Sequence, residues 1–301
     1  GCQIVRVAVP NLAAAKAVGK IKEAIDLPLV VDIHFDYRLA LECVEAGADK
    51  VRINPGNIGG ADRVKAVARA CARRNIPIRI GVNGGSLEKP ILAKYGGVTP
   101  QAMVDSAFGH IALLNRYDFD DICVSLKSSS VPITMGAYEL MHQQADYPLH
   151  LGVTEAGTTR MGTLKSAAGI GGLLALGIGD TFRVTLTADP VEEVYAARDI
   201  LKAAGVRKEG PELVSCPTCG RTRIDLIGLA TQVEERLKAV DKPITVAVMG
   251  CVVNGPGEAS AADVGIAGGN GEGLLFRKGE IVKKVPQEAL VDELFALIEE
   301  L

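Results

Sequence analysis

Several residue types that mark particular functions are scarce in this chain of 301 residues. It has no tryptophan, and aromatic residues make up 4% of it, which argues against a surface for stacking nucleic-acid bases. The formal net charge of −3 gives no basic footprint for nucleic acid. No apolar run reaches the roughly 18 residues of a membrane span, and the opening GCQIVRVAVPN lacks the features of a signal peptide. We therefore expect no nucleic acid and no membrane among its partners.

The seven cysteines do not form the pattern of a secreted disulfide scaffold. A reducing, cytoplasmic location is therefore expected. Four of the cysteines lie in apolar surroundings without motif spacing, and we expect them to be small buried hydrophobic residues: Cys2, Cys43, Cys71 and Cys123.

Short β-branched runs alternate with Ala- and Leu-rich helical stretches from residue 3 to about 205. Such alternation predicts βα units around a parallel sheet. Seven units are found, so the pattern favours an α/β fold, a TIM-like (β/α)8 barrel lacking one unit. Because Gly1 leads straight into a strand, the missing unit is expected to be the first.

The alternation of strand and helix patterns ends near residue 206, where the polar segment GVRKEGPE is typical of a linker. Beyond it come a helical pattern (IGLATQVEERLKAV), a buried strand (PITVAVMG), a hairpin around LLFRKGEIVKKV and a terminal helix (QEALVDELFALIEEL). We therefore predict two domains, a barrel over 1–207 and a small α+β domain over 208–301.

Single cations interrupt five of the seven predicted barrel strands. Charged residues are seldom fully buried without a partner, and arginine presents donors that match phosphate oxygens. The pattern therefore favours a phosphate or diphosphate site at the barrel mouth, although pairing with Asp32 or Glu155 is an alternative for some of the cations. The cations are Arg6, Arg52, Arg79, Lys127 and Arg183, with the polar residues Asn54, Asn83, Ser86, Ser125 and Thr185 nearby.

Three further residues near strand ends could serve either chemistry or structure. Glu155 follows a strand in GVTEAGTTRMG, where it is either a general acid or base or a salt-bridge partner of an arginine. Asp32 and His34, in VVDIHFD, have the same two interpretations. His150 is expected to be a structural histidine.

Cysteines in the second domain suggest a metal. Cys216 and Cys219 form a C-x-x-C pair, Cys251 lies downstream, and Glu258 follows it. The domain contains no histidine and three cysteines, which disfavours a structural zinc site, and a redox pair would leave Cys251 unused. The spacing favours an iron–sulfur cluster held by three thiolates, with Glu258 a candidate fourth ligand.

Taken together, VRINPGNIG, PIRIGVNGGSLEK, PLHLGVTEAG, GIGDTFRVTLTADPVEEV, SCPTCGRT and MGCVVNGPGEA closely resemble the 4-hydroxy-3-methylbut-2-enyl diphosphate synthases in their bacterial two-domain form. These are the iron–sulfur reductases of the methylerythritol phosphate route to isoprenoids. The resemblance covers essentially the whole chain. It implies a TIM-like barrel joined to a [4Fe–4S] domain, and the two-electron reductive opening of 2-C-methyl-D-erythritol 2,4-cyclodiphosphate with loss of water.

The resemblance also implies roles for individual residues. Cys216, Cys219, Cys251 and Glu258 look like the cluster ligands, and Glu155 looks like the acid/base group. Flavodoxin or ferredoxin would donate the electrons, and a head-to-tail homodimer would complete the site. A chain without the first unit would have an open barrel and doubtful activity. The diphosphate cradle, with Asp32 beside it, would comprise Arg6, Arg52, Asn54, Arg79, Asn83, Lys127, Arg183 and Thr185.

One alternative from another class remains at this point. A phosphate-binding aldolase barrel could form a Schiff base on Lys127, with the cysteines in a structural metal-binding domain.

Overall fold

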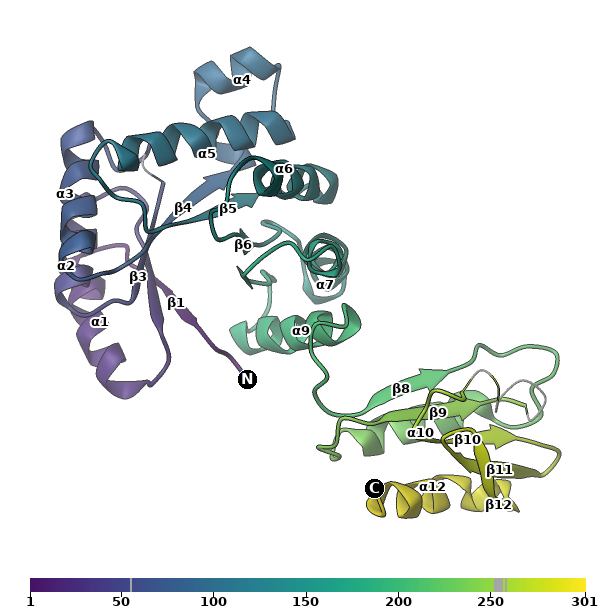
Figure 1. Ribbon diagram of the computed structural model, residues 1–301. Helices are drawn as coiled ribbons and strands as arrows, with labels where there is room; N and C mark the ends of the chain where they lie inside the picture. Colours follow the sequence, from purple (N-terminus) through teal and green to yellow (C-terminus); the bar gives the residue numbers. More distant parts are fainter. Residues whose placement is uncertain (55, 252–256, 258) are drawn as a thin grey trace. The chain divides into compact units, whose positions relative to one another are not determined.

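The computed structural model describes residues 1–54, 56–251, 257 and 259–301. They form two compact units, Gly1–Arg207 and Lys208–Leu301, each of which is described by itself (Figure 1). Within the described residues, no helix has the length and apolar character needed to cross a membrane.

Parallel strands follow one another in chain order in the first unit. Five of them form one sheet in the order β1-β2-β3-β4-β5, and the short strands β6 and β7 pair with each other. A parallel bridge between Val124 and Leu149 joins β5 to the start of β6. The strands are β1 (Val5–Ala8), β2 (Leu29–Asp32), β3 (Lys50–Ile53), β4 (Ile78–Asn83), β5 (Ile122–Lys127), β6 (His150–Leu151) and β7 (Thr181–Phe182).

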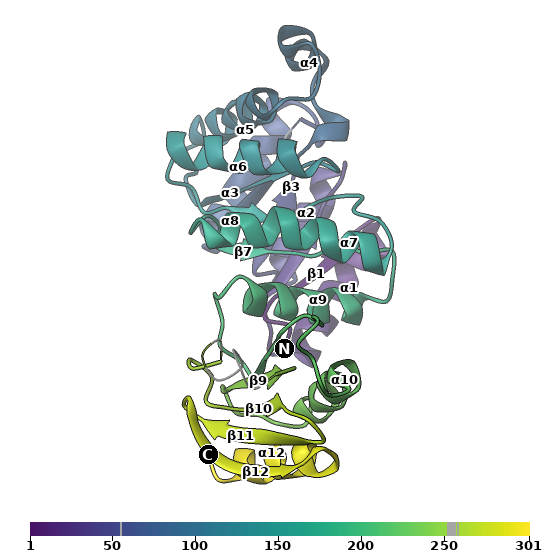
Figure 2. The same cartoon turned by 90° about the vertical axis from the view of Figure 1, so that its right-hand side faces the viewer.

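Helices connect these strands and surround them, as Figures 1 and 2 show. Side-chain caps fix several helix starts, because an oxygen of the residue before the helix accepts an N–H of the first turn, as Asn11, Thr99 and Asp189 do. The helices are α1 (Leu12–Ala24), α2 (Tyr37–Glu45), α3 (Ala61–Arg73), α4 (Lys89–Tyr95), α5 (Pro100–Asn115), α6 (Val131–Gln144), α7 (Thr159–Ser166), α8 (Gly172–Ala175) and α9 (Pro190–Ala203), with the short 3-10 turn η1 (Gly84–Ser86).

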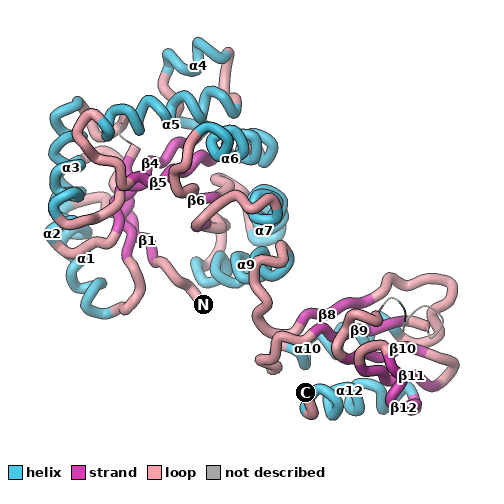
Figure 3. Tube along the Cα trace, viewed as in Figure 1, coloured by secondary structure: helices cyan, strands magenta, loops and turns pink. Residues whose placement is uncertain are grey.

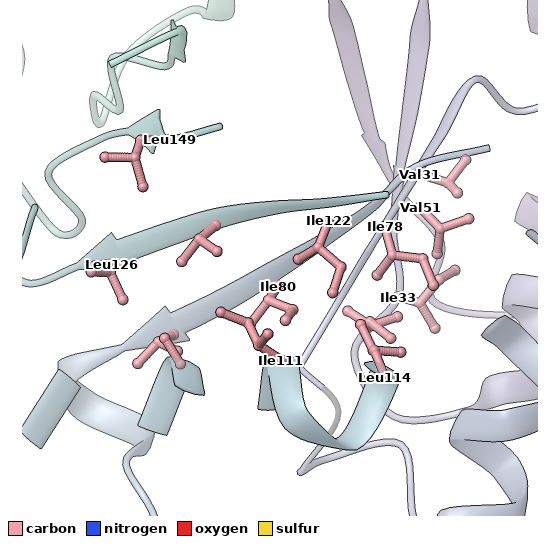
Figure 4. Packing of buried hydrophobic residues seen from close by; sticks show 14 of the residues in the cluster. Val31, Ile33, Val51, Ile78, Ile80, Ile111, Leu114, Ile122, Leu126 and Leu149 are labelled. Atoms are coloured by element: carbon pink, nitrogen blue, oxygen red, sulfur yellow. The ribbon is translucent and has the colours of Figure 1, made fainter. Parts of the chain in front are cut away.

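Alternation along the strands separates an apolar face from a polar one. Val31, Val51 and Ile80 belong to the buried cluster that packs against helices, where α5 contributes Ile111 and Leu114 (Figure 4). Successive side chains of a strand point to opposite faces. The residues between those apolar ones, which include most of the strand cations, therefore face the other way, into the barrel.

The glycine-rich segment after α7 is helical. One turn of it, η2 (Ala167–Gly171), is a π-helix that continues into α8. A Cβ on Gly169 would lie 2.9 Å from Cγ2 of Val153, so glycine allows this helix to approach the barrel wall. The segment ends in a turn at Gly177, whose φ is +76°.

Three of the four cysteines without motif spacing are buried as expected, namely Cys43, Cys71 and Cys123. The expectation is wrong for Cys2, which is exposed. Cys2 precedes β1 in a segment, residues 1–4, that is exposed throughout, and its Sγ lies 3.3 Å from the carbonyl oxygen of Ile4.

In the part of the second unit that the structure describes, helices pack on a mixed sheet (Figure 3). Its strand order is β12-β11-β10-β9-β8, parallel between β8, β9 and β10 and antiparallel beyond. Helices α10 and α12 pack on the sheet through an apolar cluster. The elements are β8 (Glu212–Ser215), α10 (Leu226–Leu237), β9 (Thr245–Met249), β10 (Val264–Gly268), β11 (Glu272–Arg277), β12 (Glu280–Pro286), η3 (Gln287–Ala289) and α12 (Leu290–Glu299).

Sequence reasoning missed two of these strands. Strand β8 is mostly exposed and directly precedes the C-x-x-C pair. Strand β10 contains two glycines, which normally weaken a strand. A Cβ on Gly265 would lie 2.4 Å from Cζ of Phe276, so the glycine there makes room for a large buried ring.

Candidate active site and cysteine site

The five predicted strand cations come together in the first unit. Arg52 and Arg79 are register partners on adjacent strands, and Arg79, Arg183, Arg6 and Arg52 all act electrostatically on Lys127. Arg183 lies one residue beyond β7 rather than within it. Neighbouring parallel strands therefore deliver positive charge to one region of the barrel interior.

Asp32, at the end of β2, neutralises part of this charge. Its Oδ2 lies 3.0 Å from Nη1 of Arg6, and its Oδ1 lies 2.9 Å from Nη1 of Arg52. Burial opposes ionisation of Asp32, but Arg52 and Arg6 together hold the pKa of its carboxyl below the usual value. The alternative of internal pairing thus holds for two of the five cations, and Asp32 orients both.

The other three cations form no ion pair with any carboxylate in the described part of the chain. The Nε atoms of Arg79 and Arg183 are buried without a hydrogen-bond partner there, while Nη2 of Arg183 donates to Oγ1 of Thr185 at 3.0 Å. Burial lowers the pKa of Arg79 to about 10. Buried charges without partners are costly, so this arrangement suits an anion that supplies several acceptor oxygens.

Lys127 closes β5 and is buried. Burial, followed by repulsion from Arg79 and Arg183, lowers the pKa of its ammonium group well below the usual value. A Cβ on Gly152, which follows β6, would lie 3.1 Å from Cε of Lys127. Glycine at this position leaves room for the lysine side chain.

Two glycines that support this region gave no signal in the sequence. Besides Gly152, Gly81 in β4 lies against Arg52, whose Nη2 donates to the Gly81 carbonyl at 3.2 Å. A Cβ on Gly81 would lie 2.3 Å from Nε of Arg52. Any larger residue would push the guanidinium away from Asp32.

The predicted asparagines lie where the strands end. Asn54 directly follows β3 and is buried, and its Oδ1 accepts the Gly56 N–H at 3.0 Å. Asn83 ends β4 and is the register partner of Lys127. Active sites of parallel barrels form at this carboxyl end of the strands.

Glu155 follows β6 and is exposed. Its φ is +52°, a left-handed conformation that non-glycine residues seldom adopt and that clusters at functional sites. Within residues the structure describes, Glu155 forms no ion pair, so the salt-bridge alternative finds no support. The adjoining loop is held by Thr187, whose N–H donates to the Gly157 carbonyl at 3.0 Å.

The two predicted histidines differ in their surroundings. His34 is exposed, with Nε2 3.6 Å from Oδ2 of Asp32. His150 is buried and its Nδ1 lies 2.9 Å from Oγ1 of Thr181 on the neighbouring strand. Burial and the surrounding cations lower the pKa of His150 well below its usual value, which agrees with a neutral, structural histidine.

Cysteines of the second unit lie at the ends of adjacent parallel strands. Cys216 follows β8, Cys251 follows β9 after Gly250, and Ser215 is the register partner of Val248. The Gly250 N–H donates to Sγ of Cys216 at 3.1 Å. Two of the three thiols are thereby brought to the same edge of the sheet.

Cys219 is exposed in the loop that follows. Hydrogen bonds from Arg221 and then Thr222 lower the pKa of its thiol, and its own N–H donates to Oγ1 of Thr222 at 3.2 Å. The predicted fourth ligand, Glu258, lies outside the described residues.

Comparison with known proteins agrees with both units. The family model described as the GcpE TIM-barrel domain matches residues 1–198. The model described as the GcpE protein C-terminal domain matches residues 212–300. The chain belongs to the GcpE family.

Curated relatives of this GcpE chain have the name 4-hydroxy-3-methylbut-2-en-1-yl diphosphate synthase (flavodoxin). That of Caldanaerobacter subterraneus is 60% identical over 100% of this chain and 85% of its own length. That of Clostridium perfringens is 61% identical over 99% and 86%, and that of Geobacter sulfurreducens is 59% identical over 100% and 85%. The family establishes a TIM barrel with a smaller C-terminal domain.

The cysteines of the GcpE chain fit an iron–sulfur cluster by their chemistry. Thiolates are the usual ligands of such clusters, and hydrogen bonds to the sulfur atoms adjust the reduction potential of the cluster. Cys216 receives one such bond, and the surroundings of Cys219 favour its thiolate. Among the residues described, no three His, Cys, Asp or Glu side chains are grouped for a metal.

Proposed function

We propose that the chain converts 2-C-methyl-D-erythritol 2,4-cyclodiphosphate into 4-hydroxy-3-methylbut-2-enyl diphosphate, an oxidoreductase reaction of isoprenoid biosynthesis. Two electrons open the ring and one molecule of water leaves. The observation that carries the proposal is the set of three cations, the buried Arg79 and Lys127 and the half-buried Arg183, without a carboxylate partner in the described part of the barrel. A diphosphate supplies the acceptors they lack.

Binding of the diphosphate would be shared among the strand ends. Arg6 and Arg52 are preorganised by Asp32, while Arg79, Lys127 and Arg183 supply positive charge and form no ion pair with a carboxylate among the described residues. Because the diphosphate is also the leaving group of the ring opening, the same cations stabilise the charge that develops as the carbon–oxygen bond breaks. Asn54, Asn83 and Thr185 add neutral hydrogen bonds.

Glu155 is assigned the proton transfer. It follows β6 at the carboxyl end of the strands and is exposed, so a substrate can reach it. Its carboxyl group would protonate the departing hydroxyl so that it leaves as water.

Cys216, Cys219 and Cys251 would hold a [4Fe–4S] cluster, with Glu258 as the fourth ligand. When bound, the cluster supplies the two electrons singly. The Gly250 N–H donates to Sγ of Cys216, and hydrogen bonds from the backbone and side chain of Arg221 lower the pKa of the Cys219 thiol. The domain assignment follows: 1–207 binds substrate and 208–301 binds the cluster.

Flavodoxin, which the names of the relatives contain, or ferredoxin would donate the electrons. A head-to-tail homodimer, in which the second domain of one copy serves the barrel of the other, would complete the site. The location would be cytoplasmic.

Anaerobic purification followed by assay tests the proposal. We expect about four irons and four sulfides per chain, and product formation from the cyclic diphosphate with reduced flavodoxin. Stoichiometric zinc without sulfide would contradict the cluster. Borohydride trapping of a carbonyl substrate on Lys127 would favour the aldolase alternative, which membership of the GcpE family argues against.

A further inference from the structure

Helix α5 carries a buried polar contact outside the predicted cradle. Ser106 and His110 lie one turn apart on α5, and both are buried. Both contact Glu88, the residue before α4: the Ser106 hydroxyl donates to Oε2 at 2.8 Å, and His110 Nε2 lies 2.8 Å from Oε1. One carboxylate thus joins α5 to the loop that follows β4.

The same pair lies against the loop that follows β3. A Cβ on Gly56 would lie 3.2 Å from Cε1 of His110, 3.3 Å from Oδ1 of Asn54 and 3.6 Å from Oε1 of Glu88. Gly56 therefore lies close to His110 and Glu88, and a side chain at this position would meet both. Its N–H in turn donates to Oδ1 of Asn54 at 3.0 Å.

That last bond determines how Asn54 can serve a ligand. With Oδ1 engaged by its own loop, the Asn54 side chain offers its amide N–H groups. These are donors, as a diphosphate requires. If Gly56 shifted, Oδ1 would be released and the amide could turn its oxygen toward the anion instead.

We propose that Glu88 and His110 are positioning residues that hold Gly56 in place, so that the amide N–H groups of Asn54 face the diphosphate. Glu88 also fixes the end of the loop that begins at Asn83. The ligand in this inference rests on the proposed function.

A matched control lies on the same helix. Asp105 accepts from Nζ of Lys94 at 2.5 Å and from the Tyr95 hydroxyl at 2.8 Å. It links α5 to α4 as Glu88 does, but it lies on the exposed side and does not touch residue 56. Asp105→Asn should therefore leave ligand binding unchanged.

Calorimetric titration with inorganic diphosphate tests the inference in the full chain. Glu88→Ala should weaken binding about tenfold, the effect of losing one hydrogen bond to a charged group. Glu88→Gln, which keeps the side-chain length and one acceptor oxygen for the Ser106 hydroxyl, should recover most of that loss. Gly56→Ala, which crowds His110 and Asn54 and leaves residue 88 a glutamate, should weaken binding several-fold and serves if Glu88→Ala does not fold.

Three outcomes separate the possibilities. Weakened binding in Glu88→Ala and Gly56→Ala, restored in Glu88→Gln, supports the inference. Wild-type affinity in Glu88→Ala or Gly56→Ala with a lowered melting temperature would overturn it, because the pair would then be purely structural. Absence of diphosphate binding by the wild-type protein would overturn the proposed function and the inference together.

Discussion

The backbone N–H of Gly250 donates a hydrogen bond to Sγ of Cys216 across 3.1 Å. Gly250 directly precedes Cys251, so this bond ties together two loops that each supply a cysteine. A Cβ on Gly250 would lie 2.9 Å from Oγ1 of Thr222, so the contact requires glycine. The hydrogen bond to sulfur thus holds the loops of Cys216 and Cys251 together.

Removal of a cluster thiol should empty the site. Cys216→Ser, Cys219→Ser and Cys251→Ser are each expected to reduce iron from about four per chain to below one, with loss of the brown colour. Cys2→Ser is the control, because Cys2 is exposed and lacks motif spacing. Iron and sulfide analysis after anaerobic purification makes the measurement, and full iron in all three variants would remove these cysteines from the ligand set.

Replacement of Asp32 should destabilise the barrel in a pH-dependent way. Loss of one partner of a buried ion pair costs about 3 kcal/mol, so Asp32→Asn should lower the free energy of unfolding at pH 7 by that order. The folded-state pKa of Asp32 lies below 3.8, so the ionised carboxylate stabilises the fold above about pH 4. That contribution is lost as the pH falls through the lowered pKa.

Urea unfolding at pH 7 and at pH 3 to 4 measures the difference between wild type and Asp32→Asn. The difference should shrink toward the acid end. Asp36→Asn removes an exposed pair with Arg38 and should change stability by less than about 1 kcal/mol. A difference for Asp32→Asn that is equally large at both pH values would show that its effect is not electrostatic.

Replacement of Lys127 should raise the melting temperature and lower the affinity for diphosphate. Its folded-state pKa is lowered by burial and by Arg79 and Arg183, so the folded state disfavours the charged form. Lys127→Met removes that cost, and we expect its melting temperature to rise by about 2–4 °C. Diphosphate affinity should fall, and a lower melting temperature with unchanged affinity would contradict the assignment.

Diphosphate binding should also be coupled to proton uptake by Lys127. An anion beside the ammonium group raises its pKa toward the usual 10.5. At a pH between the lowered and the usual value, the wild-type protein should take up more protons on binding than Lys127→Met. Titration calorimetry in buffers of different ionisation enthalpy measures the difference, and equal uptake would argue against a neutral lysine in the free protein.

Glu155→Gln should separate binding from turnover. The variant keeps the size of the side chain but cannot donate the proton, so kcat is expected to fall at least about a hundredfold while substrate affinity stays within a few-fold. Steady-state assays with reduced flavodoxin, together with equilibrium binding, give the two values. Turnover at the wild-type level would show that another group supplies the proton.

A stability measurement on the same residue checks its backbone. Because φ is +52° at Glu155, Glu155→Gly should relieve local strain and leave stability unchanged or higher, with activity lost. Glu155→Gln retains the strain. Reduced stability in Glu155→Gly would mean that the side chain has structural contacts beyond its loop.

Sequence reasoning reached the barrel because its buried strands are β-branched runs and its helices are amphipathic. It also found the cations, because a charge within an apolar strand is conspicuous. Which of those cations pair with a carboxylate was not predictable from the sequence. That Asp32 contacts Arg6 and Arg52 depends on the register of three strands, which one sequence does not reveal.

Contacts that depend on glycine, which has no side chain, were also not predictable from the sequence. Gly81 and Gly152 leave room for an arginine and a lysine side chain, respectively. Gly56 leaves room for the imidazole of His110. Those partners are distant in the sequence. Strand β10 was missed for a related reason, since its glycines weaken the strand pattern, while Phe276 occupies the space beside Gly265 and Ile224 the space beside Gly268.

The barrel wall is uneven in its hydrogen bonding. Strands β4 and β5 pair over six residues each, whereas β6 and β7 pair over two, and β6 is joined to β5 through the bridge at Leu149. Amide hydrogens of β4 should therefore exchange slowly and those around β6 sooner, because local opening breaks fewer bonds there. Glu155 follows β6, so we expect the proposed proton donor to lie beside a part of the barrel wall that opens at a lower free-energy cost than β4.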